Sequence, residues 1–272
     1  LGSTRLADYD HAFPYKEGSM NQSSGLLFAR GQKNISLTGF GTIDGQGGSE
    51  TFQFGNDGDG GPKRPKLIYL VECQGIVVTD LTLRNSAYWV QHYERCEDVT
   101  IRGLKVFSHC NYNNDGLDID AKNATISDCY IDVEDDAICF KSDHPEFCEN
   151  ITVTNCVTAS NCNAIKFGTA SHGGYRNIAV SNCVVRRAAE DNIRHWSKQL
   201  EHISAEVTVI SGVAIEMVDG GIIDGITVSN ISMRDVQTPI FIRLGDRHRT
   251  FRKEGGVLKN INISNIVATA ES

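Results

Sequence analysis

The stretch Asn150-Ile151-Thr152-Val153-Thr154-Asn155 decides the fold, because variants of it return from one end of the chain to the other. The further copies occupy residues 34–39, 75–80, 98–103, 123–128, 177–182, 225–230 and 260–265. Each copy alternates apolar and small polar residues and ends in Asn, Asp or Gly. This pattern is typical of a short strand with one buried face, closed by a turn.

The spacing of these copies is close to 25 residues. Measured between their first apolar residues, the steps from Ile76 to Ile178 are 23, 25, 27 and 27 residues. A unit of this size cannot bury its own apolar face, so it must stack on its neighbours. We therefore predict an all-β fold, a single-stranded parallel β-helix with coils about 4.8 Å apart. A β-sandwich would not need such near-identical phrases, and propeller blades are longer, at about 40–50 residues.

The turns and the irregular steps carry further expectations. Asparagines that end the copies, Asn155, Asn182, Asn230 and Asn265, are expected to stack, with their amides bonded to backbone groups of adjacent coils. The longer steps predict insertions at residues 56–65, 187–204 and 245–256. In a solenoid such insertions often rim one binding face.

Composition and charge exclude several classes of protein. The 272 residues are 40% hydrophobic and 22% charged, with no apolar run near the 18 residues that a membrane span requires. The net charge of −8 argues against nucleic acid as a partner on electrostatic grounds. Six basic residues within a dozen positions form either a solvated loop or a groove for an acidic ligand: Arg243, Arg247, His248, Arg249, Arg252 and Lys253. No oligomer is predicted.

Nine cysteines are present, without a CxxC pair of zinc-type spacing. Cys129, Cys156 and Cys183 recur at equal steps of 27 residues, which predicts stacked, buried, unpaired thiols. Cys139 and Cys148 flank a short polar loop and are candidates for a disulfide.

Acidic residues concentrate in two neighbouring coils. Asp115 lies in Asn113-Asn114-Asp115-Gly116-Leu117-Asp118, and Asp136 follows 21 residues later in Glu134-Asp135-Asp136-Ala137-Ile138. This step is close to one coil, so the carboxylates should face the same way on adjacent rungs. Close carboxylates repel, which keeps a proton on one while another stays ionised, as acid–base cleavage of a glycosidic bond requires. The alternative is that both motifs are only turn sequences.

These two motifs, together with the upstream Gly41-Thr42-Ile43-Asp44-Gly45-Gln46-Gly47, resemble glycoside hydrolase family 28, the polygalacturonases. Gly220-Gly221 and Thr238-Pro239-Ile240-Phe241-Ile242 extend the resemblance over essentially the whole chain. It implies a right-handed parallel β-helix and an inverting hydrolase of pectin that needs no metal or other cofactor. By the same resemblance Asp135 is the general acid, Asp115 and Asp136 activate water, and Asn113 orients a carboxylate or the sugar.

The sequence departs from the family at two positions. The Gly-His-Gly motif falls on Asn161-Cys162-Asn163-Ala164-Ile165, where no histidine stands, and the Arg-Ile-Lys motif falls on Ala214-Ile215-Glu216. An anionic Glu216 would repel a uronate in that subsite, so plain homogalacturonan is not the expected substrate. We expect Asn163 and Glu216 to contact the substrate. Other candidates for its binding are Lys141, Lys166, Arg194, His195 and the sugar-stacking Trp196.

The resemblance also bears on the limits of the chain. Residues 1–272 are expected to form one β-helical domain, an internal section that lacks part of an N-terminal cap and the last coils. The first residues show no signal peptide, so a secreted or periplasmic location is inferred only from a polymeric substrate.

Two other functions remain open from the sequence. A β-helical polysaccharide lyase would need a calcium site and a basic proton abstractor, for which no clear Arg or Lys stands beside the acidic motifs. A non-catalytic carbohydrate-binding solenoid would explain the missing family histidine and Arg/Lys pair. The expected partner in each case is a pectic polysaccharide or oligosaccharide.

Overall fold

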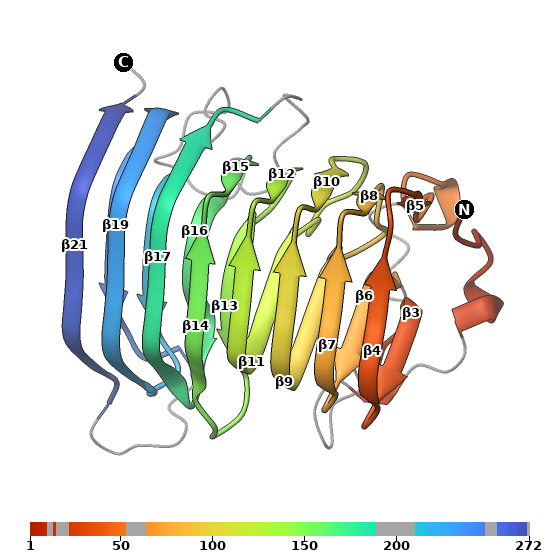
Figure 1. The fold of residues 1–272 in the computed structure, drawn as a ribbon, viewed down its shortest axis with the longest axis horizontal. Helices are drawn as coiled ribbons and strands as arrows, with labels where there is room; N and C mark the ends of the chain where they lie inside the picture. Colours follow the sequence, from red (N-terminus) through yellow and green to blue (C-terminus); the bar gives the residue numbers. More distant parts are fainter. Residues whose placement is uncertain (10–12, 15–21, 53–63, 189–209, 248–254, 271–272) are drawn as a thin grey trace.

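The chain folds into a stack of coils. The computed structural model describes residues 1–9, 13–14, 22–52, 64–188, 210–247 and 255–270. Of these residues, 65% lie in strands and 3% in helices, and the predicted right-handed parallel β-helix is confirmed. The coils lie side by side along the long axis, from the N-terminal end to the C-terminal end (Figure 1).

Each complete coil contributes one strand to each of three parallel sheets, which we call A, B and C. Sheet A contains β3 (Gly25–Arg30), β6 (Lys66–Val71), the first parts of β9 (Gln91–Arg102) and β11 (Leu117–Ser127), β13 (Ile138–Ser142), β16 (Asn163–Ser171), β18 (Ser211–Met217) and β20 (Thr238–Leu244). Sheet B contains β4 (Lys33–Thr38), β7 (Gln74–Thr79), the second parts of β9 and β11, β14 (Cys148–Thr154), and the first parts of β17 (Gly174–Arg186), β19 (Ile222–Val236) and β21 (Val257–Ala270).

Sheet C contains β5 (Thr42–Asp44), β8 (Thr82–Arg84), β10 (Lys105–Ser108), β12 (Tyr130–Val133), β15 (Val157–Ser160) and the last parts of β17, β19 and β21. The remaining described elements are two short 3₁₀ helices, η1 (Leu6–Tyr9) and η2 (Glu50–Phe52), and the antiparallel pair β1 (Phe13–Pro14) and β2 (Gln22–Ser23).

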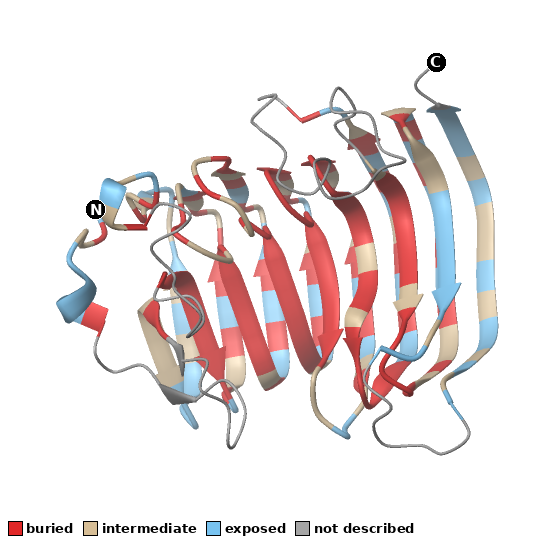
Figure 2. Ribbon diagram, turned by 180° about the vertical axis from the view of Figure 1, so that it is seen from behind, coloured by how far each residue is buried: buried red, intermediate tan, exposed pale blue. Residues whose placement is uncertain are grey.

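Alternation along each strand separates the interior of the coil from its outside. In sheet A, Ile138, Ile165 and Val213 lie opposite one another in register, and all three are buried. The rings of Phe140 and Phe167 stack one coil apart with centroids 4.4 Å from each other. Such residues join one apolar core. Buried positions recur from coil to coil along the stack (Figure 2). The alternation between outward and inward positions therefore decides which side chains of sheet A face the cleft described below.

The asparagine turns stack as predicted, but their hydrogen bonds differ from the prediction. The amide of Asn265 donates to the side-chain oxygen of Asn230, and that of Asn230 to the side-chain oxygen of Asn182. The expected partners were backbone groups. These asparagines adopt a left-handed backbone, with φ of 55° at Asn182 and Asn230, which projects each amide along the stack toward its counterpart.

A second row of stacked asparagines, the Asn150 ladder, is formed by the first residues of repeated phrases. Asn150 donates from its amide to the side-chain oxygen of Asn123 (3.1 Å) and accepts from the amide of Asn177 (2.8 Å). Its φ is 58°, a conformation that asparagine and glycine tolerate better than other residues.

The predicted free thiols are confirmed, and the predicted disulfide candidate is wrong. Cys129, Cys156 and Cys183 are buried and unpaired. Cys139 and Cys148 are also free. Cys148 belongs to the apolar core, whereas the Cys139 thiol bonds the carbonyl of Gly168 outside that core, so the two sulfur atoms lie on different sides of the coil wall.

Several expectations fall outside the described residues or stay predictions. Most of the three expected insertions, with Arg194, His195 and Trp196, lie in residues that the structure does not describe. The single-domain assignment with incomplete ends stays a prediction. Within the described residues, no helix is long and apolar enough to cross a membrane.

The Asn150 ladder predicts a specific stability pattern. We expect Asn150→Ala to lower the free energy of unfolding by about 2–3 kcal/mol, because it loses two ladder hydrogen bonds and strains the left-handed backbone. Asn150→Gly should lose less, since glycine tolerates the positive φ. Urea denaturation of both variants measures the difference. Equal stability of the alanine variant and the parent protein would contradict a structural role for the ladder.

Candidate active site

The outer face of sheet A carries the candidate site. The segments that lead into its strands already stack: the N–H of Gly116 donates to the carbonyl of Asp136 (2.8 Å), and that of Ala137 donates to the carbonyl of Asn163 (2.9 Å). Asp115 and Asp136 therefore occupy adjacent rungs in phase, as their spacing predicted. A Cβ at position 116 would lie 2.7 Å from the carbonyl oxygen of Ala137, so only glycine fits this approach.

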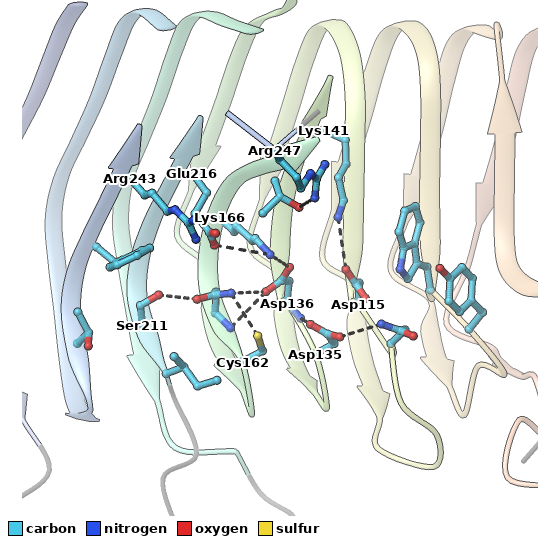
Figure 3. A pocket seen from close by; sticks show the side chains of 18 residues that line it. Asp115, Asp135, Asp136, Lys141, Cys162, Lys166, Ser211, Glu216, Arg243 and Arg247 are labelled. Carbon is cyan, nitrogen blue, oxygen red and sulfur yellow. Dashed lines mark hydrogen bonds and ion pairs between the residues drawn. The ribbon is translucent and has the colours of Figure 1, made fainter. Parts of the chain in front are cut away.

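A cleft with a volume of about 590 Å³ opens above these segments (Figure 3). Its lining includes eight of the eleven residues assigned to catalysis or binding from the sequence: Asn113, Asp115, Asp135, Asp136, Lys141, Asn163, Lys166 and Glu216. The other three, Arg194, His195 and Trp196, lie outside the described residues. The rest of the lining is Tyr88, Trp89, Cys162, Thr169, Ile210, Ser211, Thr238, Phe241, Arg243 and Arg247.

Asp136 is held as a carboxylate. Its Oδ2 accepts from the Lys166 ammonium (2.8 Å), and its Oδ1 accepts from the Asn163 amide (2.7 Å). The oxygen of that amide accepts from the hydroxyl of Ser211 (2.5 Å), which fixes its orientation. Burial alone would raise the pKa of Asp136, but the charges of Lys166 and Lys141 and these hydrogen bonds hold it below its usual range.

Asp115 has the opposite tendency. Burial, followed by the negative charges of Asp118 and Asp135, raises its pKa well above the usual range. Its Oδ1 is buried and has no hydrogen-bond partner in the described part of the chain, and the Lys141 ammonium lies 3.7 Å from Oδ2. Lys141 lies closer to Asp118, at 3.1 Å, where burial raises the pKa to about 6 against the opposing pull of Lys141.

Asp135 lies between the other two carboxylates. Its Oδ1 accepts from the backbone N–H of Asp136 (2.9 Å), and its Oδ2 accepts from the Asn113 amide (3.3 Å). The oxygen of the Asn113 amide accepts in turn from the Arg64 guanidinium (3.2 Å). Asn113 therefore holds Asp135 from the preceding coil, and its role in catalysis stays a prediction.

Glu216, at a position that departs from the family pattern, belongs to a connected charge group with Lys166 and Asp136. Lys166 stands 3.8 Å from Glu216 as well as 2.8 Å from Asp136, and its side chain is only 12% exposed. Although burial opposes it, the charge of Asp136 raises the pKa of Lys166 well above the usual range. Lys166 is thus a largely buried cation that bridges two acids.

Two aromatic residues that the sequence reasoning missed close one end of the cleft. The rings of Tyr88 and Trp89 stack with centroids 5.2 Å apart, and the ammonium groups of Lys66 and Lys141 each lie 4.6 Å from the centroid of Trp89. A signal existed: Trp89 precedes Asp115 by 26 residues, close to one coil, and the N–H of the next residue, Val90, donates to the Asp115 carbonyl.

One group of side chains has the proximity of metal ligands. Asp135, Asp136 and Cys162 each place one donor atom within 4.8 Å of the others. However, the Asp136 oxygens are already occupied by Asn163 and by the Lys166 cation, which would repel a metal ion. Burial also raises the pKa of the Cys162 thiol well above its usual range, so it is a poor ligand. The arrangement gives no support to a metal, and the expected absence of cofactors stays a prediction.

The fold and the site together define a parallel β-helical protein with a row of carboxylates on the outer face of one sheet. The sequence profile of glycosyl hydrolases family 28 matches residues 12–272, and the chain belongs to that family.

Known relatives share this assignment over part of their length. The chain is 33% identical over 135 residues to a probable polygalacturonase of Vitis vinifera, a match that covers 48% of this chain and 27% of the relative. The family 28 exopolygalacturonase of Yersinia enterocolitica superposes with a TM-score of 0.76 at 18% identity, covering all of this chain and 55% of that one. Endo-xylogalacturonan hydrolase of Aspergillus tubingensis gives 0.65 at 19% identity, over 91% and 65%.

Removal of the buried cation tests how Asp136 is held. We expect Lys166→Met to raise the pKa of Asp136 and to lower the free energy of unfolding by about 3–5 kcal/mol, since it leaves a buried carboxylate unpaired. The lowered pKa of Asp136 stabilises the fold above its unfolded value of 3.8, so the deficit should shrink as the pH falls below that value. Carboxyl NMR titration and urea denaturation measure both effects.

Lys105→Met serves as the matched control, because Lys105 is exposed on β10 of sheet C, away from the cleft. An unchanged Asp136 pKa in Lys166→Met would show that Lys141 and Asn163 keep this carboxylate ionised without Lys166.

Proposed function

We propose that the protein is an inverting glycoside hydrolase that acts on a pectic polysaccharide or oligosaccharide other than plain homogalacturonan. In this proposal Asp135 protonates the departing glycosidic oxygen, and Asp136, with Asp115, activates the attacking water. Asn113, Asn163, Lys166 and Glu216 position these groups and the sugar. Because pectin is a polymer outside cells, we propose a secreted or periplasmic location.

The observation that carries the proposal is the division of protonation among three neighbouring carboxyl groups. Asp136 is kept ionised by Lys166 and Asn163, whereas burial and like charges keep one proton shared between Asp115 and Asp135. In this proposal that proton is on Asp135 when the bond is cleaved, so that Asp115 is then ionised and assists Asp136. Hydrolysis of a glycosidic bond needs both states at once, an acid that can donate and a carboxylate that can accept. If the two acidic motifs served only as turns, their carboxylates would not need to be paired with Lys141 and Lys166.

The proposed inversion at the anomeric carbon rests on family membership more than on the distance between the carboxyl groups. Asp135 and Asp136 each place an oxygen within 4.8 Å of the other, which is shorter than the roughly 6.5–9.5 Å typical of inverting acid–base pairs. The decisive experiment is therefore to digest defined pectic oligosaccharides and to follow the released anomer by ¹H NMR. Release of the anomer opposite to that of the substrate linkage supports inversion, and release of the same anomer contradicts it.

The charges of the cleft bear on the substrate. Ala214 and Glu216 stand where the family pattern has two cations, and Lys166 on the preceding coil pairs with both Asp136 and Glu216, so these two rungs present no unpaired cation to the sugar. A uronate there would not meet a free cation, whereas a neutral sugar would meet hydrogen-bonding groups only. This supports a substrate that mixes neutral and acidic sugars, such as a branched or rhamnogalacturonan-type region. The relation to a xylogalacturonan hydrolase is compatible with such a substrate.

A lyase mechanism fits less well. Contrary to the sequence-based expectation, Lys141 and Lys166 do stand beside the acidic motifs. Burial lowers the pKa of each ammonium, but neighbouring carboxylates outweigh it and raise the pKa above the usual range. Both lysines therefore keep their protons at neutral pH and are poor proton abstractors. A lyase would release an unsaturated uronide that absorbs in the ultraviolet, which the same digestion detects.

Replacement of the proposed acid should abolish turnover. We expect Asp135→Asn to lower kcat by about 10²–10⁴-fold, the usual contribution of a general acid, with little change in substrate affinity. Asp235→Asn is the control, because its side chain is 50% exposed on β19 and does not line the cleft. Unchanged turnover in Asp135→Asn would refute the assignment. Glycan binding without turnover by the parent protein would favour a carbohydrate-binding solenoid.

The opposite pKa shifts predict a bell-shaped dependence of kcat/KM on pH. Activity should fall at low pH when Asp136 is protonated, and at high pH when the cluster that contains Asp115 loses its proton. Lys166→Met should move the acidic limb toward higher pH, because the ammonium that lowers the pKa of Asp136 is gone. Initial rates across the pH range measure both limbs. A shift of the alkaline limb alone would contradict this assignment.

A further inference from the structure

The cations of the cleft differ in whether they already have an acidic partner. Lys141 pairs with Asp118 at 3.1 Å, and Lys166 pairs with Asp136 at 2.8 Å. The Arg247 guanidinium pairs with both oxygens of Asp219, at 2.7 and 3.1 Å, and also donates to the hydroxyl of Thr169. These three cations are neutralised by the protein itself.

Arg243 is different. It lines the same cleft and is exposed to solvent, and it makes no hydrogen bond or ion pair with any residue in the described part of the chain. Its nearest rung neighbour is Glu216, which lies opposite it in the parallel register of β18 and β20. Figure 3 shows the Arg243 side chain beside Glu216 and directed into the cleft. Glu216 makes its ion pair with Lys166.

The register explains why this arginine stands where it does. Ala214-Ile215-Glu216, on which the Arg-Ile-Lys motif of the family falls, pairs residue by residue with Phe241-Ile242-Arg243 in the next coil. β18 therefore has Glu216 where the family motif ends in a cation, whereas β20 has Arg243 at the paired position. Because neighbouring strands lie about 4.8 Å apart, the positive charge is displaced by one rung along the cleft.

We propose that Arg243 is the specificity-determining residue for an acidic sugar, whose carboxylate its guanidinium binds one coil beyond the Lys166–Glu216 pair. This inference rests on the proposed function and deepens it. The neutral sugar lies over the Lys166–Glu216 pair, and the uronate lies over β20. Phe241 lines the cleft and is 40% exposed, so its ring is available to the apolar face of the same sugar.

The physical basis is the geometry of the guanidinium. Its planar fork makes paired, charge-assisted hydrogen bonds with a carboxylate, which a lysine ammonium cannot reproduce. An arginine without an internal partner loses no ion pair when the substrate enters. Glu216 opposes the incoming carboxylate, and Lys166, which it shares with Asp136, offsets this repulsion in part.

The test compares one glycan in two charge states. Rhamnogalacturonan oligosaccharides of defined length are used as such and after reduction of their carboxyl groups to alcohols. We expect Arg243→Gln to lower kcat/KM for the acidic form by about 10- to 100-fold, the usual value of a hydrogen bond to a charged group, mainly through KM. The reduced form should change by less than about twofold, and Arg243→Lys should recover only part of the loss.

Two controls separate the possible outcomes. Arg234→Gln, an arginine with a side chain 84% exposed on β19 outside the cleft, should leave both substrates unaffected. Equal losses on both substrates in Arg243→Gln would show that this residue only balances Glu216 structurally, and no loss on either would show that it does not contact the glycan. Both results overturn the inference while the hydrolase proposal stands.

Binding measurements keep the inference testable if no substrate is turned over. Calorimetric titration of the parent protein with the acidic and the reduced oligosaccharides reports recognition without catalysis. A preference for the acidic form that disappears in Arg243→Gln supports Arg243 even if the hydrolase proposal fails. Equal affinities for the two forms, or binding of neither, would overturn it.

Discussion

The register between successive coils is the constraint on which the rest of the structure depends. Backbone hydrogen bonds hold each residue of sheet A directly beside its counterpart one coil away, as with Cys139 and Lys166 or Ala214 and Phe241. A side chain therefore cannot choose its neighbours freely. Like residues that can hydrogen-bond to one another stabilise the stack, as Asn123, Asn150 and Asn177 do. Like charges in the same arrangement repel.

In the candidate site, this repulsion contributes to different pKa shifts of neighbouring carboxyl groups. Asp115 and Asp136 lie on adjacent rungs with Asp135 between them, and burial makes their negative charges costly. Lys166 relieves Asp136 directly, whereas Lys141 is shared between Asp118 and Asp115 and lies farther from the latter. The two carboxyl groups consequently shift in opposite directions, although both belong to the same buried cluster. A symmetrical distribution of cations would have erased that difference.

The fold and much of the site could be predicted from the sequence, because both depend on phase. The repeated phrase fixed the coil length, and the 21-residue step from Asp115 to Asp136 was enough to place them on one face. Features that depend on side-chain direction were harder. The asparagine amides bond each other instead of the backbone, and Cys139 and Cys148 lie on different sides of the wall. Neither fact follows from spacing alone.

Trp89 and Arg243 show a further limit of motif-based reasoning in a solenoid. Both stand in the phase of candidate site residues but in other coils, so a comparison of motif letters at fixed positions does not assign them to the site. Since every coil offers the same outward positions, a charge can be lost on one rung and gained on the next without any change in the backbone. Here Ala214-Ile215-Glu216 stands in place of the cationic motif of the family, and Phe241-Ile242-Arg243 beside it carries an arginine. Substrate preference in such a fold is therefore encoded by the order of charges along the stack, and the same chemistry can serve a glycan whose acidic sugar lies one unit further along.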